Sequence, residues 1–327
     1  MNTSAPPYLS IVLTGRNDNY GGDFNERFFR ALRFNHTNLA AHGVDHEVVF
    51  VEWSPLAGRP HLSDLLAAEF SDLAATALTC YVVDPRYQDE LSLNPSIKYL
   101  EYLAKNVGLR RATGRFVLST NTDVFFGESV VASLASGRLE AGTVYRAPRF
   151  DLKLGIDQSH VSWEMLDDER NQTRRGTLAP PLLSGAAGDF LLADRESVHR
   201  LKGFNEVYRL ARVGIDVNFL VKAYGAGLRM ADIGGPVYHV DHIGSHRSSK
   251  SLYDDSTAPW GRGRWHARTA SYDNPHTWGL AEAPQVEVGP RTFRIDFDWA
   301  AMPPLVELRR VVLPVRRVGQ ADAGGDA

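Results

Sequence analysis

Short apolar runs alternate with longer amphipathic stretches along residues 1–126. Apolar runs of this length, bounded by turn residues, are typical of buried strands, and the amphipathic stretches between them are typical of helices. Strands are expected at 9–14, 47–53, 80–84 and 115–120, and helices at 23–34, at 61–75 and from Asn94-Pro95 onward, where a cap residue precedes a proline. This alternation predicts βα units that build a mainly parallel sheet flanked by helices, and therefore an α/β fold.

After residue 127 the pattern becomes less regular. Residues 151–175 are polar, and we expect a long loop there, which in a compact domain is usually a lid or an insertion. Further strands are expected at 143–147, 190–193 and 237–240, and further helices at 129–134, 195–201 and 216–224. We therefore predict a domain over 1–250, an irregular C-terminal extension packed on it over 251–317, and a disordered tail over 318–327.

The composition narrows the class of protein. The 327 residues include 36 Lys and Arg against 39 Asp and Glu, a net charge of −3, and 43% of the residues are hydrophobic. This composition is that of an ordinary globular protein, and it argues against a mainly disordered chain and against binding of nucleic acid through bulk positive charge. Cys80 is the single cysteine, which excludes an internal disulfide and a cysteine-rich zinc site.

The distribution of apolar residues bears on location. No run approaches the roughly 18 apolar residues of a membrane helix, and the start MNTSAPPYLS lacks the basic and apolar regions of a signal peptide. We therefore expect a cytoplasmic protein without a transmembrane segment. Residues 305–318 mix apolar residues with arginines, which is compatible with peripheral contact at the inner membrane face. Pro314 interrupts a helix there, which favours packing against the body of the protein.

A polar tripeptide, Asn121-Thr122-Asp123, follows the strand expected at 115–120. In open α/β sheets the carboxyl ends of the strands form the edge where ligands bind, and a carboxylate there can hold a divalent cation beside a diphosphate. The alternative is a simple turn, because these residue types favour turns. The tripeptide is thus a candidate site that other segments must support.

Histidines gather near the end of the domain, in the segment VYHVDHIGSHR. Strand periodicity places His239 and Asp241 on one face and His242 on the other. The cluster, which also includes His246, could hold a transition metal by itself, as in hydrolases, or add a ligand to a cation held by Asp123. A histidine near a strand end can also be purely structural.

The segment KNVGLRRATGRFVLSTNTD resembles GT-A-type glycosyltransferases of the family 2 kind. There a Lys/Arg-Asn-x-Gly helix leads through Ala-x-Gly into a strand ending in Asp-x-Asp, which binds the metal and diphosphate of a nucleotide sugar. Asn121 replaces the first aspartate here. The resemblance implies a Rossmann-type fold and a donor site that includes Lys105, Asn106, Asn121, Thr122 and Asp123.

Two further segments resemble the donor half of the family, which would cover residues 8–126. LSIVLTGRND corresponds to a first strand and a nucleotide-contacting loop, and EVVFVEW to a second strand whose acidic end lies near the base or ribose. The resemblance therefore adds Glu52, for which a solvated strand-end carboxylate is the alternative. It also adds the loop residues Thr14, Gly15, Arg16 and Asn17.

The implied acceptor half covers residues 140–246. GAAGDFLLADRESVHRLKGFNE resembles the segment that shapes the acceptor pocket, and RVGIDVNFLVKAYGAG resembles the stretch with a Glu-Asp pair at a helix start. Ile215 replaces the glutamate and Asp216 is retained. In inverting members that aspartate is the general base, although it could equally cap its helix. Asp189 and Trp278 are candidates for acceptor binding, and Trp278 could equally serve only to anchor the extension to the core.

The resemblance implies a hexosyltransferase-like enzyme of glycan or polysaccharide biosynthesis that moves a sugar from a UDP- or GDP-type donor to an acceptor hydroxyl. Mn²⁺ or Mg²⁺ would be held by Asp123 with His242 and then His239, and residues 247–250 could close over the diphosphate. Two alternatives stay open. One is an inactive binding protein with this fold, favoured by Asn121 and Ile215, and the other is a His-cluster metallohydrolase.

Overall fold

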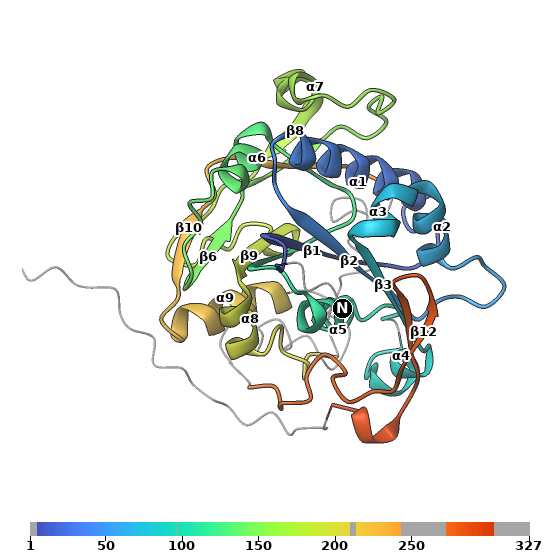
Figure 1. Cartoon of the computed structure of the whole chain (residues 1–327). Helices are drawn as coiled ribbons and strands as arrows, with labels where there is room; N and C mark the ends of the chain where they lie inside the picture. The colour runs from blue at the N-terminus through green and yellow to red at the C-terminus, as the bar shows by residue number, and fades with distance from the viewer. Residues whose placement is uncertain (1–4, 96, 210–213, 243–272, 304–327) are drawn as a thin grey trace, which may run out of the picture.

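A nine-stranded sheet forms the centre of the molecule in the computed structural model, which describes residues 5–95, 97–209, 214–242 and 273–303 (Figure 1). The strand order is β10-β6-β9-β4-β1-β2-β3-β13-β12. The strands are β1 (Leu9–Gly15), β2 (His46–Trp53), β3 (Leu78–Val83), β4 (Phe116–Thr120), β6 (Thr143–Arg146), β9 (Phe190–Asp194), β10 (Arg229–Asp232), β12 (Gln285–Gly289) and β13 (Thr292–Ile295). β1 pairs in parallel with both β2 and β4, whereas β9 runs antiparallel to β4 and β6. The predicted α/β class with a mainly parallel sheet is confirmed.

The central strands are covered by helices on both faces. β1 and β2 are buried at every position, as expected of parallel strands between two helical layers. Ile11 and Leu13 pack on one face, and Val12 packs on the other. The first layer contains α1 (Phe24–Ala41), α2 (Leu62–Glu69), α3 (Ser71–Thr76) and α6 (Glu128–Ala135), and the second contains α4 (Arg86–Leu91), α5 (Glu101–Arg111), α8 (Arg195–Leu201) and α9 (Ile215–Gly225) (Figure 1).

A second, four-stranded sheet lies beside α1, in the order β5-β11-β7-β8. The strands are β5 (Val124–Phe126), β7 (Arg149–Leu152), β8 (Gln172–Arg175) and β11 (Val237–Val240), and α7 (Trp163–Asp167) lies between β7 and β8 in the chain. The expectation of one long loop over 151–175 is therefore wrong. The strand expected at 237–240 is confirmed as β11. β5, β7 and β8 were missed because they are short, and because β7 and β8 are rich in charged residues.

Three predicted helices also differ. The helix expected over 23–34 is longer, since α1 runs to Ala41. The helix expected from Asn94-Pro95 begins only at Glu101, because Gln88 holds the preceding segment in an open loop. The Gln88 side chain donates to the Ile97 carbonyl and accepts from the Leu100 amide. The helix expected over 61–75 is divided into α2 and α3, since Phe70 has φ −122° and ψ 54°.

The described part of the C-terminal extension contributes to the main sheet. β12 and β13 form a hairpin, and β13 pairs in parallel with β3. The alternation of apolar and polar residues in these two short strands is too brief to predict the hairpin. The candidate phosphate residues 247–250, His246, the membrane-contact segment 305–318 and the tail lie outside the described residues, and the domain division stays a prediction. Among the described helices, none combines the length and the apolar character of a membrane span.

Candidate metal centre

Asp123, His239 and His242 come together where the two sheets meet. Each offers one ligand atom, these atoms lie within 4.8 Å of one another, and all three residues are buried. Asp123 lies in the turn between β4 and β5, and His239 pairs with Val124 in the antiparallel β5–β11 register. The distance from Asp123 Oδ2 is 3.6 Å to His239 Nε2 and 3.4 Å to His242 Nε2. The structure thus brings together the three residues that were expected from the sequence to hold a metal.

The loop after β1 and the start of α1 close one side of the cluster. Arg27 is buried, and its Nε lies 3.6 Å from Asp123 Oδ2. The Arg27 guanidinium also pairs with Asp23 and donates to the Tyr20 carbonyl at 3.0 Å. Gly21 has φ 78°, and a Cβ there would lie 2.7 Å from His242 Nδ1. Only glycine fits this approach, because a side chain would displace His242 from the cluster.

Charge pairing favours the ionised forms of Asp123 and His239. Burial alone would raise the pKa of the Asp123 carboxyl, but His239 and His242 hold it well below its ordinary value. Burial disfavours the charged form of His239, yet Asp123 and Asp151 raise its pKa to about 9. A divalent cation binding here would replace the imidazole proton. One carboxylate oxygen with two imidazole nitrogens suits Mn²⁺ and other transition metals better than Mg²⁺, which prefers oxygen ligands alone.

The residue that replaces the first aspartate of the resembled motif is held in a polar network. Asn121 Nδ2 donates to Asp189 Oδ1 at 2.7 Å, and Lys105 Nζ donates to Asn121 Oδ1 at 2.7 Å. Arg149 Nη1 donates to the other Asp189 oxygen at 2.9 Å. An aspartate at position 121 would face the carboxylate of Asp189, so the amide matches its neighbour by donating to it. Thr122 is buried between the network and the metal cluster.

Asp216 lies in the first turn of α9. A Cβ on Gly188 would lie 2.9 Å from the Tyr102 hydroxyl and 3.6 Å from Asp216 Oδ2, so these groups lie close together around that glycine. Burial raises the pKa of the Asp216 carboxyl, against the opposing effects of the Val217 amide and the Arg146 cation. A carboxylate with a raised pKa is better suited to accept a proton at neutral pH.

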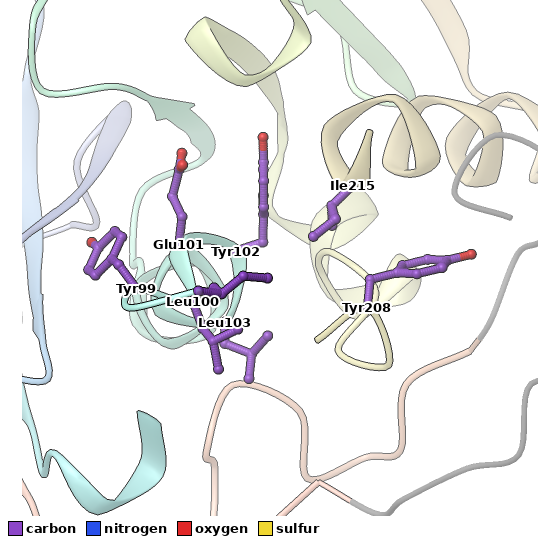
Figure 2. Close-up of a pocket in the computed structure, with 8 residues that line it drawn as sticks. Tyr99, Leu100, Glu101, Tyr102, Leu103, Tyr208 and Ile215 are labelled. Atoms are coloured by element: carbon purple, nitrogen blue, oxygen red, sulfur yellow. The ribbon is translucent and has the colours of Figure 1, made fainter. Parts of the chain in front are cut away.

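A small cavity is lined by Ile215, the residue before Asp216 in the chain. Glu101 and Tyr102 extend side by side from the start of α5, and Ile215 and Tyr208 lie opposite them (Figure 2). A wider groove of about 950 Å³ lies at the other edge of the sheet, lined by Tyr8, among others. Because ligands of open α/β sheets bind at the carboxyl edge, which holds the Asp123 cluster, we assign the candidate site to that edge.

The predicted loop residues at the end of β1 are tied to neighbouring segments. Thr14 is buried, and a Cβ on Gly15 would lie 2.9 Å from the ring of Phe24. Arg16 donates to the Lys98 carbonyl at 2.8 Å. Asn17 donates to the Pro60 carbonyl at 3.0 Å. The loop is thus anchored at the carboxyl edge, and its contact with a nucleotide stays a prediction.

Three other predicted residues are engaged within the protein, and the ligand contacts of Glu52 and Asn106 stay predictions. The Glu52 carboxylate accepts from the Leu62 and Ser63 amides, at the start of α2. Asn106 donates to the carbonyl of Phe204 and accepts from its amide. Trp278 is 1% exposed and packs in the core, so the structure offers no open ring face for a sugar there.

Sequence reasoning missed the charged groups that surround the cluster, namely Arg27, Arg149 and Asp151. A weak signal existed for two of them. Arg149 and Asp151 alternate with apolar residues in RFDL, the pattern of a strand with one polar face. Four residues are too few to distinguish this pattern from a loop.

No sequence-family model matches the chain, and no curated protein matches it in sequence. The fold is similar to a crystal structure of GalNAc-T7 with UDP, GalNAc and Mn²⁺, at a TM-score of 0.45 and 14% identity, over 72% of this chain and 44% of that one. It is also similar to a crystal structure of S. aureus TarS, at a TM-score of 0.39 and 14% identity, over 71% of this chain and 36% of that one. A third similar structure is that of the catalytic domain of Drosophila beta1,4galactosyltransferase 7 in complex with xylobiose. The TM-score is 0.41 and the identity 12%, over 89% of this chain and 94% of that one. The chain spans less than half the length of the first two, and its fold class rests on its own sheet topology.

Proposed function

We propose that the chain is a GT-A-type glycosyltransferase that moves a hexose from a nucleotide-diphosphate donor of the UDP or GDP type to an acceptor hydroxyl. The observation that carries the proposal is the buried Asp123–His239–His242 cluster at the carboxyl end of β4. β1 lies between β2 and β4 and pairs in parallel with both, so the strand order reverses direction at β1. Ligands of open α/β sheets bind at such a switch point.

The loop after β1 and the turn after β4 supply the donor side of this site. A divalent cation held by Asp123, His239 and His242 would stabilise the charge that develops on the departing diphosphate. Lys105 adds a buried positive charge beside Asn121, and Arg27 adds another beside Asp123. These cations are placed where a diphosphate would need them, which fits a chain whose net charge is only −3.

Asp216 would act on the acceptor side as the general base of an inverting transfer. The acceptor oxygen forms its bond to the anomeric carbon while the bond from that carbon to the diphosphate breaks, and the Asp216 carboxylate takes the hydroxyl proton. Asp189 would bind the acceptor with its orientation fixed by Asn121 and Arg149. We place the enzyme in glycan or polysaccharide synthesis in the cytoplasm.

Calorimetric titration with UDP and GDP, each with and without Mn²⁺, tests the donor side. We expect one nucleotide to bind in the presence of Mn²⁺ and to bind at least tenfold more weakly without it. Release of nucleotide from a panel of nucleotide sugars then tests turnover. Failure of every nucleotide to bind in the presence of Mn²⁺ would refute the proposal.

Two other outcomes would assign a different function. Binding of a nucleotide without any turnover of its sugar conjugates would favour an inactive binding protein. Tight zinc binding without nucleotide binding, with a hydrolytic activity that survives Asp216→Asn, would favour a metallohydrolase built on the same histidines.

A further inference from the structure

β7 presents two kinds of side chain on its two faces. Phe150 and Leu152 pack into the apolar cluster of the second sheet. Arg149 and Asp151 alternate with them and therefore lie on the opposite face, toward the metal cluster. β7 runs parallel to β11, and Asp151 is the direct register partner of His239.

This register places the His239 ring between two carboxylates. His239 Nδ1 lies 3.6 Å from Asp151 Oδ1, and Nε2 of the same ring lies 3.6 Å from Asp123 Oδ2. One ring nitrogen therefore faces the candidate metal position while the other faces Asp151. A ring in this position can bind a cation through one nitrogen and donate a proton from the other.

Asp151 has an acceptor oxygen to spare for that proton. The residue is 4% exposed, and its Oδ1 receives no well-aligned hydrogen bond from the described residues. Arg149 Nε lies 2.8 Å from this oxygen as an ion pair, and Arg174 Nη1 lies 3.6 Å from Oδ2. A buried carboxylate oxygen without a hydrogen bond is costly, and a shift of a few tenths of an ångström would bring the His239 Nδ1–H into range.

We propose that Asp151 is the positioning residue that makes His239 a metal ligand. Asp151 accepts the Nδ1–H of His239, which fixes the tautomer whose Nε2 lone pair points toward Asp123. The inference rests on the metal site of the proposed function. A carboxylate behind a ligating imidazole orients the ring and makes it a stronger donor.

The same arrangement accounts for a site with a single ligating carboxylate. Asn121 stands where the resembled motif has its first aspartate. Its side chain donates to Asp189 and adds no negative charge. Asp151 supplies a negative charge instead, one imidazole ring further from the cation. Arg149 pairs with both Asp151 and Asp189, so it fixes the two carboxylates relative to each other.

The test compares the Mn²⁺ affinity of the full chain with that of Asp151→Asn and Asp151→Leu. The asparagine oxygen still accepts the imidazole proton but lacks the charge, so we expect about tenfold weaker binding, and up to about 100-fold weaker binding for leucine. Arg174→Gln is the matched control, because Arg174 touches Asp151 from the half-exposed side without reaching the ring. It should change the Mn²⁺ affinity less than threefold.

A second measurement separates positioning from mere structural support. Long-range ¹H–¹⁵N spectra of the Zn²⁺-loaded protein report which nitrogen of His239 carries the proton, and we expect Nδ1 in the unaltered chain and exchange broadening in Asp151→Leu. Thermal unfolding without metal identifies any variant that fails to fold. If Asp151→Leu fails to fold, the Mn²⁺ affinity of Asp151→Asn decides the outcome. Unchanged Mn²⁺ affinity in folded variants overturns the inference alone. Absence of metal binding in the unaltered chain overturns the metal site itself, and the inference with it.

Discussion

The ends of β2 and β4 carry two buried carboxylates at the same edge of the same sheet, and these carboxylates differ in their hydrogen-bond partners. Glu52, at the end of β2, accepts from the Leu62 amide at 2.8 Å and from the amide and hydroxyl of Ser63 at 3.1 Å each. Asp123, after β4, faces Arg27, His239 and His242 at 3.4 to 3.6 Å. Backbone amides hold Glu52 in the fold, and the imidazole near it, 3.6 Å away, belongs to the exposed His61. Asp123 instead faces two buried imidazoles, and this difference is why we propose Asp123 and not Glu52 as a metal ligand.

Removal of the Asp123 charge should have the largest effect. In Asp123→Asn, the only carboxylate of the candidate cluster is lost, and we expect Mn²⁺ binding and sugar transfer to fall below detection. Calorimetry with Mn²⁺ and a nucleotide-release assay measure the two effects. If this variant bound Mn²⁺ as well as the unaltered chain, Asp123 would not be a metal ligand and would not differ from Glu52 in that respect.

Asp216→Asn sharpens the contrast by removing a carboxylate that should bind neither metal nor donor. We expect kcat to fall by about 10²- to 10⁴-fold, because a general base contributes on that scale. The Mn²⁺ and nucleotide affinities should stay within about twofold of their original values. Unchanged kcat would leave Asp216 with the alternative role of a helix-start residue.

Glu52→Gln should act on stability and leave the metal site intact. A glutamine places an NH₂ group against the α2 amides, so we expect the free energy of unfolding to fall by about 1 to 3 kcal/mol. Urea unfolding measures this loss, and Mn²⁺ titration of the same variant is the control. A weaker Mn²⁺ affinity with normal stability would reverse the roles assigned to the two carboxylates.

The smallest effect concerns pH. Without metal, the His239 pKa is raised to about 9, so Mn²⁺ must displace a proton at neutral pH. The apparent Mn²⁺ affinity should therefore rise by up to about tenfold per pH unit as pH approaches 9, and then level off. The ion pair contributes stability to the metal-free protein below about pH 6.5, and this contribution is lost as pH rises through 9. Titrations at several pH values in His239→Gln, which lacks the proton, should give a flatter profile.

Much of the fold was predictable because its determinants are local. The apolar runs around β1, β2 and β4 are buried on both faces and stand out from their polar flanks. The candidate cluster of Asp123, His239 and His242 could also be proposed from the sequence, from the residue types and their places at strand ends. The local pattern of apolar and polar residues was sufficient to predict an element when the element and its ends lay within one short segment.

The rest depended on long-range pairing. The start of α5 was mispredicted because the Gln88 side chain satisfies backbone groups that a helix would otherwise have engaged. The role of Asp151 depends on the β7–β11 register, which joins segments far apart in the chain. No local pattern indicates which strand will lie beside a histidine.

The pairing of β13 with β3 has a consequence for how the chain is made. The Cys80 amide donates to the Arg291 carbonyl, so the outer edge of β3 is completed only after the ribosome has added more than 200 further residues. Until then, a growing chain exposes a strand edge of the kind that recruits other strands. Partly synthesised chains should therefore be the most aggregation-prone form of this protein, and chaperones should act on them before the hairpin arrives.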